Sequence, residues 1–173
     1  MSGGTDIDLK RFTQRSRMKP LITLIILSLA FAANGVAQTE QKDPVKNAIE
    51  SKLYIFKART VMPASGGARQ LTSDYSLTIN GDSVVAYLPY FGRAYSVTPG
   101  QTNDGINFTS TDFTYTVTEG KKGGWMIEIK PKDARDIQQL NLNLSRNGYG
   151  TLHVNSQNRQ SISFTGKADP IKK

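Results

Sequence analysis

Residues 113–130 read FTYTVTEGKKGGWMIEIK, and this stretch decides the predicted fold. Large apolar residues recur at every second position before residue 119 and again from Trp125, with a glycine-rich connection between the two runs. Such alternation places every second side chain on one face of a β-strand, and a short glycine-containing connection joins antiparallel neighbours. The stretch therefore predicts a β-hairpin with one buried face.

The same period of two continues through most of the chain. It recurs at Tyr75, Leu77 and Ile79, at Leu140, Leu142 and Leu144, at Leu152 and Val154, and at Ile162 and Phe164. Asn80–Gly81 and Asn147–Gly148 are typical of tight hairpin turns. No strand-helix-strand alternation occurs, which excludes a parallel nucleotide-binding sheet. We predict a mostly β (α+β) fold: a curled or closed antiparallel sheet of about eight strands.

The first strand and one helix are predicted upstream of this region. Phe56, Ala58, Thr60 and Met62 alternate with Lys57, Arg59 and Val61 and are expected to share one face of a strand. Before them, Asp43–Pro44 is typical of a helix start, because aspartate caps the helix and proline needs no hydrogen-bonded N–H in the first turn. Val45, Ala48, Ile49 and Leu53 then follow at helical spacing. The pattern predicts one N-terminal amphipathic helix, roughly residues 44–54, covering one face or end of the sheet.

The amino terminus has the three parts of an export signal. Lys19 precedes an uncharged apolar run, residues 21–33, and Gly35 and Ala37 supply the small residues that signal peptidase requires. We predict a signal peptide over residues 18–37, cut between Ala37 and Gln38, and an exported protein of the periplasm or cell envelope. The run is short for a bilayer span, so membrane attachment is expected only through an uncleaved signal.

These features divide the chain into four segments. Residues 1–17 are polar and are interpreted as non-native or as an extended n-region of the signal. Residues 38–43 form a linker, and residues 44–173 form a single β-rich domain, a length that can enclose a hydrophobic core.

Composition excludes several classes of function. The chain has 22 basic and 14 acidic residues, and the part from Gln38 onward keeps 17 and 12 of them, a net charge of +5. No dense Lys/Arg run occurs, so nucleic acid is not an expected partner. The absence of cysteine excludes disulfides, thiolate nucleophiles, zinc–thiolate sites and a lipidated cysteine. No cofactor and no metal site are predicted.

Catalytic candidates are few. His153 is the single histidine, and its neighbours Leu152 and Val154 occupy the buried face of their strand, so His153 should face outward. One outward histidine favours neither a Ser-His-Asp triad nor a zinc site. Asp133 and Asp136 flank Arg135 and form the one carboxylate pair suited to acid–base chemistry on a glycoside, or else a solvated loop.

A tyrosine-rich segment, residues 87–95, has two interpretations. Tyr87, Tyr90, Arg93 and Tyr95 could form an aromatic and cationic platform that stacks on sugar rings or pairs with an anion. Alternatively, Pro89 and Gly92 mark a bend at which the tyrosine rings pack and their hydroxyls hold the backbone. The same two interpretations apply to Asn158 and Arg159 in a later turn. These six residues are the candidate ligand-binding residues, and no catalytic residue is assigned.

The string Tyr87-Leu88-Pro89-Tyr90-Phe91-Gly92-Arg93-Ala94-Tyr95, with Asn80-Gly81-Asp82 before it, resembles the domain-of-unknown-function family numbered 4251. Gly105-Ile106-Asn107-Phe108 and the segment 158–164 extend the resemblance over residues 55–166. The resemblance implies an exported single domain of the kind known mostly from Bacteroidetes. It implies no activity and no site residues.

Two functions remain open. The first is a non-catalytic binding or accessory module of the envelope, which holds a small apolar or glycan ligand or contacts another envelope protein. The second is a carboxylate-based hydrolase acting on envelope glycans. Two carboxylates within about 10 Å in one concave pocket would favour the hydrolase.

Overall fold

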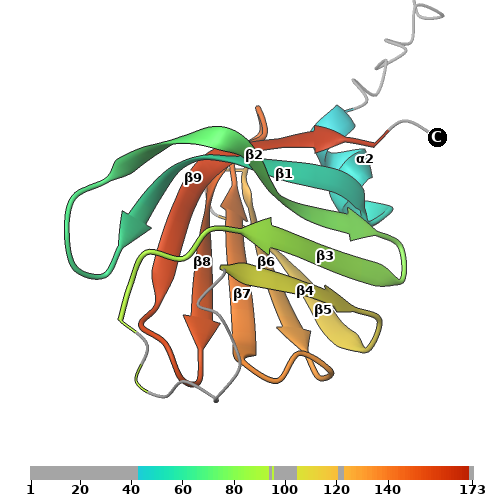
Figure 1. The fold of residues 1–173 in the computed structure, drawn as a ribbon. Coiled ribbons are helices and arrows are strands. Elements are labelled where there is room, and N and C mark those ends of the chain that lie inside the picture. Colours follow the sequence, from blue (N-terminus) through green and yellow to red (C-terminus); the bar gives the residue numbers. More distant parts are fainter. Residues whose placement is uncertain (1–42, 94, 96–104, 121–122, 172–173) are drawn as a thin grey trace, which may run out of the picture. The chain divides into compact units, whose positions relative to one another are not determined.

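The computed structural model describes residues 43–93, 95, 105–120 and 123–171. Within these ranges the chain forms one helix and nine strands, all of the strands in one antiparallel sheet (Figure 1). The elements are α2 (Pro44–Glu50), β1 (Leu53–Pro63), β2 (Arg69–Asn80), β3 (Ser83–Leu88), β4 (Ile106–Ser110), β5 (Phe113–Glu119), β6 (Trp125–Pro131), β7 (Ile137–Leu144), β8 (Tyr149–Ser156) and β9 (Ile162–Pro170).

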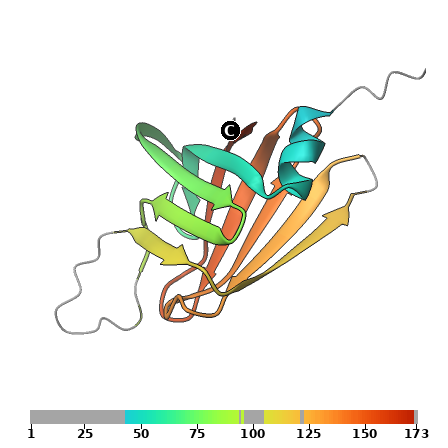
Figure 2. The same cartoon turned by 90° about the vertical axis from the view of Figure 1, so that its right-hand side faces the viewer.

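The strand order explains why the sheet curls. The order is β4-β3-β2-β1-β9-β8-β7-β6-β5, so the first and last strands pair and join two meanders. β4 and β5 lie at opposite ends of this order, yet only Thr111 and Asp112 separate them in the chain. A two-residue link cannot span a flat sheet of this width, since neighbouring strands lie about 4.8 Å apart. The sheet therefore bends into a nearly closed, barrel-like form (Figure 2).

The predicted fold class is thus confirmed in its main features, with nine strands where the pattern predicts about eight. β3 and β4 are short, at six and five residues, and a period of two is hard to detect over so few positions.

Large side chains fill the inner face of the sheet. Phe56, Leu142 and Phe164 are fully buried, with 0% of their surface exposed. Inward positions alternate with outward ones along β6, β7 and β9, and the outward residues are polar except for Met126. The hydrophobic core therefore occupies the hollow of the curled sheet, as expected for a small barrel-like structure.

A β-bulge changes the predicted face of the first strand. Phe56 and Ala58 are buried as expected, but the register of β1 shifts between Ala58 and Thr60. An inserted residue moves each later side chain to the opposite face. Val61 is consequently buried, and Met62, predicted to lie on the buried face, is 37% exposed.

Two glycines mark the most crowded part of the sheet. Gly150 of β8 pairs with Gly166 of β9. A Cβ atom at Gly150 would lie 2.0 Å from the carbonyl oxygen of Asn143, and one at Gly166 would lie 2.0 Å from that of Lys57. Only glycine permits backbones to approach this closely, so these positions allow the strong curl of β8 and β9.

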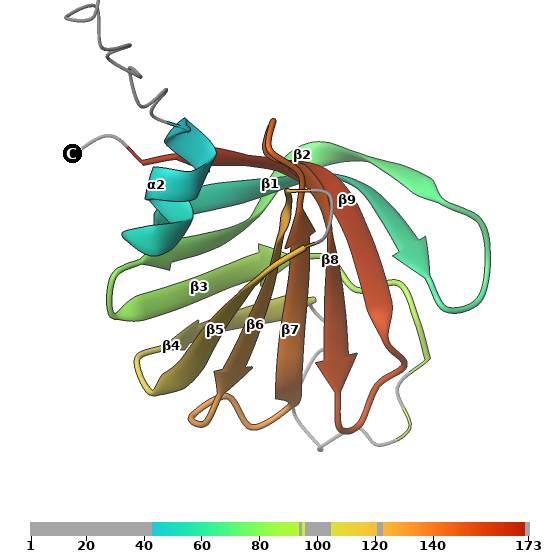
Figure 3. The same ribbon diagram turned by 180° about the vertical axis from the view of Figure 1, so that it is seen from behind.

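The helix begins where the sequence predicts and ends earlier. The Asp43 carboxylate accepts hydrogen bonds from the backbone N–H groups of Val45 (3.1 Å) and Lys46 (3.3 Å). The helix ends at Glu50 instead of near residue 54, because Lys52 adopts a positive φ of 54° and Leu53 begins β1. Figure 3 shows α2 beside the start of β1 and the end of β9.

Among the residues that the structure describes, no helix combines the length and apolarity needed to span a membrane. The predicted signal peptide with its cleavage site at Ala37 and Gln38, and the segments before and after it as far as residue 42, lie outside these residues.

Candidate functional site

The tyrosine-rich segment is tied to the turn between β8 and β9. The Tyr90 hydroxyl lies 3.0 Å from the Arg93 carbonyl oxygen and 3.1 Å from that of Gln160. The backbone N–H of Tyr95 donates to the Asn158 carbonyl oxygen (2.8 Å), and that of Gln160 donates to Arg93 (3.2 Å). Burial raises the pKa of Tyr90, although its hydrogen bond to Gln160 opposes that effect. The tyrosine hydroxyl and the backbone thus hold this bend in place.

Arg159 is the centre of this arrangement. Its Nε atom lies 2.8 Å from Oδ2 of Asp136, and its Nη1 donates to the Gly105 carbonyl oxygen at 2.8 Å. The guanidinium also lies over the Tyr90 ring, 5.2 Å from the ring centre. Only 16% of the Arg159 side chain is exposed. The guanidinium thus contacts a carboxylate, a backbone carbonyl and a ring from three segments of the chain, and it has little surface left for a ligand.

Tyr87 and Tyr95 differ from the rest of the predicted set. Tyr87 is 54% exposed on the outer face of β3 and stacks on Tyr75, with ring centres 5.5 Å apart. These two rings, with Tyr90, Phe91 and residues of β3 and β4, line a hollow of about 270 Å³. Tyr95 is 70% exposed and does not line it. Five of the six predicted residues therefore lie together where the bend meets the β8–β9 turn. They are Tyr90, Arg93, Tyr95, Asn158 and Arg159. The sixth, Tyr87, lies beside them on β3.

Both carboxylates considered for acid–base chemistry have structural partners. Asp133 accepts hydrogen bonds from the Ser110 hydroxyl and from the backbone N–H groups of Thr111 (3.0 Å) and Asp112 (3.3 Å). The Ser110 hydrogen bond, followed by that of Thr111, lowers the pKa of Asp133. Asp133 thus fixes the link between β4 and β5, while Asp136 pairs with Arg159. Neither lines the hollow beside Tyr87 or the larger groove described next.

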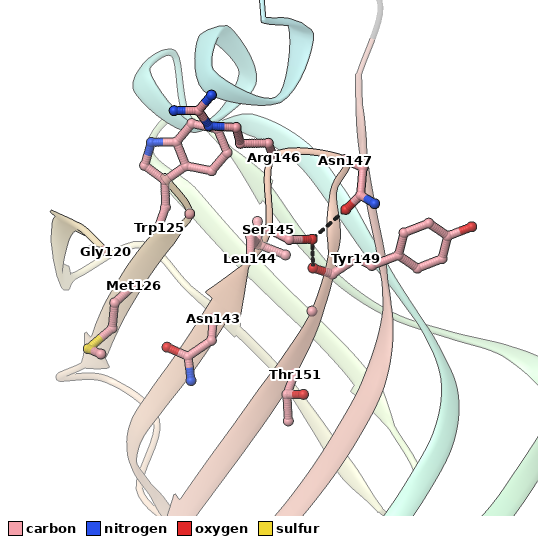
Figure 4. Close-up of a pocket in the computed structure, with 12 residues that line it drawn as sticks. Gly120, Trp125, Met126, Asn143, Leu144, Ser145, Arg146, Asn147, Tyr149 and Thr151 are labelled. Atoms are coloured by element: carbon pink, nitrogen blue, oxygen red, sulfur yellow. Dashed lines mark hydrogen bonds between the residues drawn. The ribbon is translucent and has the colours of Figure 1, made fainter. Parts of the chain in front are cut away.

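A larger groove lies where β6, β7 and β8 meet their connecting turns (Figure 4). We call it the β6–β8 groove, and its volume is about 710 Å³. Its lining residues come from the β5–β6 connection, the first residues of β6, the end of β7, the β7–β8 turn and the start of β8. They are Gly120, Gly124, Trp125, Met126, Asn143, Leu144, Ser145, Arg146, Asn147, Tyr149, Gly150 and Thr151.

Hydrogen bonds brace two sides of this groove. In the β7–β8 turn, the backbone N–H and the hydroxyl of Ser145 both bond the Tyr149 carbonyl oxygen, at 2.8 and 2.6 Å. The Nε atom of Arg146 donates to the Gly123 carbonyl oxygen at 3.0 Å and so bridges to the β5–β6 connection. The turn and the connection are therefore held at a fixed separation, which keeps the groove preformed.

The groove combines exposed apolar surface with neutral polar groups. Tyr149 is 53% exposed and Met126 is 55% exposed. Asn143 pairs with both Met126 and Thr151 across the sheet, so these three side chains form one outward row. Trp125 is only 8% exposed, and no described residue accepts a hydrogen bond from its indole N–H. Such a set offers a stacking surface, amide groups and hydrogen-bond donors to a ligand.

The sequence did not predict the β6–β8 groove. The positive φ of 82° at Gly148 confirms the predicted Asn147–Gly148 turn. The sequence signal nearest the groove is a tyrosine, Tyr149, directly after this tight turn.

Among the described residues, the remaining catalytic groups are dispersed. His153 is exposed, as predicted, and its Nδ1 lies 2.7 Å from the Ser163 hydroxyl. No three His, Asp or Glu side chains gather within the described ranges in a way that could hold a metal ion.

Comparison with known proteins identifies the family. The model of a domain of unknown function, DUF4251, matches residues 37–168. A crystal structure of a DUF4251 family protein from Bacteroides eggerthii has a similar fold, with a TM-score of 0.55 and 17% sequence identity over 74% of this chain and 86% of that one. No curated protein matches the chain. The family match spans most of the chain and agrees with the resemblance of residues 55–166. The chain belongs to the DUF4251 family.

Proposed function

We propose that this protein is an exported, non-catalytic binding module that holds a saccharide of the cell envelope in the β6–β8 groove. Export is supported by the apolar run 21–33 and the small residues Gly35 and Ala37. The DUF4251 match begins at residue 37, next to the proposed cleavage between Ala37 and Gln38. A domain that starts where the signal ends is what processing by signal peptidase would leave.

The observation that carries the ligand assignment is the composition of the groove. Tyr149 and Met126 present exposed apolar surface, on which the C–H face of a sugar ring can pack. Asn143 offers one acceptor and two donors to hydroxyl groups, and Asn147, whose side-chain oxygen accepts from the Ser145 hydroxyl at 2.5 Å, offers its two N–H donors. Arg146 uses Nε for Gly123 and has its terminal N–H groups left to donate. A few polar groups beside an apolar surface are typical of a site that orients a small polar ligand.

The inner face of the sheet is a weaker candidate for the ligand. A ligand inside the curled sheet would have to displace Phe56, Leu142 and Phe164, which are fully buried. Protein interiors are close-packed, so a ligand would have to rearrange these side chains before it could bind. An outer groove requires no such rearrangement.

A non-catalytic role is supported by what lines the groove. The lining residues that the structure describes include no Asp, Glu or His. Glycoside hydrolysis commonly uses two carboxyl groups flanking the scissile bond, whereas Asp133 accepts from backbone N–H groups and Asp136 is paired with the Arg159 side chain, both outside the groove. The groove could therefore bind a saccharide without cleaving it.

The test compares two tyrosines of equal exposure. Residues 38–173, which include every described element, are applied to an array of bacterial envelope oligosaccharides, and binding is quantified by calorimetry for Tyr149→Ala and Tyr87→Ala. Tyr149 is 53% exposed and Tyr87 is 54% exposed, so both variants should fold. We expect Tyr149→Ala to weaken binding at least tenfold and Tyr87→Ala to leave it unchanged. The reverse result would move the site to the hollow beside Tyr87, and no binding of any saccharide would overturn the proposal.

A further inference from the structure

The strand β5 forms one edge of the sheet, and its sequence alternates threonine with other side chains. It follows β6 at the end of the strand order, and no other described strand pairs with its second side. Its seven residues read FTYTVTE, with no proline and no lysine. Edge strands are normally protected by lysine, proline, a bulge or short length, because their free N–H and C=O groups bind other strands. β5 has none of these within its described bounds.

The register shows which backbone groups of β5 are free. The N–H of Lys132 donates to the Asp112 carbonyl oxygen (2.8 Å), and that of Gly120 donates to Gly124 (2.8 Å). Both contacts belong to the register in which Phe113 opposes Pro131, so the even-numbered residues bond to β6. The odd-numbered residues direct their N–H and C=O groups away from β6. These are Phe113, Tyr115, Val117 and Glu119.

We propose that a second copy of this chain adds its β5 to this edge and forms an antiparallel dimer with a continuous sheet. A twofold axis at Thr116 places Tyr115 opposite Val117 and Phe113 opposite Glu119. Each of these positions has free groups, so every pair can exchange both of its hydrogen bonds. This match of hydrogen-bonding positions follows from the symmetry of the dimer. A twofold axis centred on any residue of β5 pairs odd-numbered positions with odd-numbered positions.

The side chains fit the same pairing on both faces of the sheet. On the inner face, Tyr115 meets Val117 of the other copy, and aromatic with β-branched pairs are among the favourable cross-strand contacts. Val117 is 39% exposed in the single chain, and the pairing would cover it. On the outer face, Thr116 meets its own copy and Thr114 meets Thr118.

The charges on β5 and β6 do not oppose this contact, and the Lys52 ammonium lies over the Tyr115 ring, 5.2 Å from the ring centre. The one charged residue of β5, Glu119, lies opposite an uncharged phenylalanine. On the neighbouring strand β6, the Glu128 carboxylate forms an ion pair with Lys130 at 2.7 Å. Because this ion pair offsets its charge, Glu128 repels Glu128 of the second copy only weakly. Figure 2 shows β4 and β5 running apart from their short connection, so β4 leaves the edge of β5 accessible.

The test is the oligomeric state of residues 38–173, measured by sedimentation velocity from about 1 to 500 µM, for the unmodified protein and two lysine variants. Val117→Lys places a charge on the edge, and Val85→Lys is the matched control, since Val85 is also 39% exposed but lies on β3 between two paired strands. We expect a dimer whose dissociation constant rises at least tenfold in Val117→Lys and is unchanged in Val85→Lys.

Hydrogen exchange makes the same proposal falsifiable where a variant fails to fold. In the unmodified protein the amides of Tyr115 and Val117 should be protected at high concentration and should exchange at least tenfold faster on dilution. A monomer over the whole range, or a dimer that Val117→Lys leaves intact, would overturn the proposal. Protection of these amides in a monomer would also overturn it, because another segment of the same chain would then fill the edge.

Discussion

Replacement of Arg159 by methionine tests whether the tyrosine-rich segment is held by the fold. The change keeps a long apolar side chain but removes the ion pair with Asp136 (2.8 Å), the hydrogen bond to the Gly105 carbonyl oxygen (2.8 Å) and the contact with the Tyr90 ring. It also leaves Asp136 with no cationic partner, and Oδ1 of that carboxylate is already buried without a hydrogen bond to a described residue.

The expected cost follows from the burial of the pair. Removing one partner of a fully buried ion pair costs about 3–5 kcal/mol, whereas an exposed pair contributes about 0–1 kcal/mol. Arg159 is 16% exposed and Asp136 is 31% exposed, so the pair lies nearer the buried limit. We expect Arg159→Met to lower the free energy of unfolding by about 2–3 kcal/mol. For a domain of this size that corresponds to a fall in melting temperature of roughly 6–12 °C.

Urea denaturation and thermal melting measure the effect, with Arg135→Met as the matched control. Arg135 is an exposed arginine one residue before Asp136, with no ion pair to a described residue, and its replacement should change stability by less than about 0.5 kcal/mol. In the Asp136→Asn background, Arg159→Met should cost less, because no charge is then left unpaired. If Arg159→Met changes stability no more than Arg135→Met does, the pair is merely a solvated contact and our reasoning about this bend is wrong.

Two further results are expected from the crowded and charged parts of the sheet. Gly150→Ala should destabilise the domain by about 1–3 kcal/mol in urea denaturation, since the new Cβ would meet a carbonyl oxygen of β7 at 2.0 Å; a neutral result would mean that β7 and β8 move apart freely. Asp133 has a pKa below its ordinary value of 3.8, mainly through its hydrogen bond from Ser110, so its contribution to stability is present above about pH 4 and lost as the pH falls through the folded-state pKa. The difference in melting temperature between the unmodified protein and Asp133→Asn should therefore shrink from pH 5 to pH 3, and a difference that grows on acidification would contradict this role.

The fold was largely predictable because its signals are local. Alternation in residues 113–130 and the turn at Gly148 depend only on neighbouring residues, and the structure confirms both. The antiparallel meander follows from the same hairpins. The curl of the sheet depends in addition on the pairing of β1 with β9, which the sequence does not encode in any one segment.

Two errors have a common physical origin. The helix ends at Glu50 because Lys52 adopts a positive φ, and the inner face of β1 changes at a bulge after Ala58. Both are single-residue departures from a regular period. Lys52 is not a glycine, and in β1 itself the bulge at residues 58–60 contains no proline or glycine, so neither position carries the usual local sequence signal.

The candidate site was only half predictable for a different reason. The segment 87–95 was prominent because its composition is unusual, and its role as a bend tied by Tyr90 was one of the two interpretations that sequence supports. The sequence predicts either a carboxylate pair or a solvated loop for the partner that matters most, Asp136, and neither interpretation includes its ion pair with Arg159. An ion pair between two loops distant in the chain depends on the strand order, which no local pattern supplies.

The β6–β8 groove shows how to separate what the fold requires from what a ligand would require. Gly124 and Gly150 line the groove, and a Cβ atom at either would lie 2.4 or 2.0 Å from a carbonyl oxygen of β7. These glycines are therefore explained by close backbone approach, and part of the hollow is a consequence of the curl. Tyr149 has no such explanation. Its ring is 53% exposed, and its one ring contact in the described chain is the Lys167 ammonium at 5.8 Å. Together with Met126, which is 55% exposed, Tyr149 leaves apolar surface beside a preformed hollow, and such a patch is typical of an interaction site that a saccharide would cover.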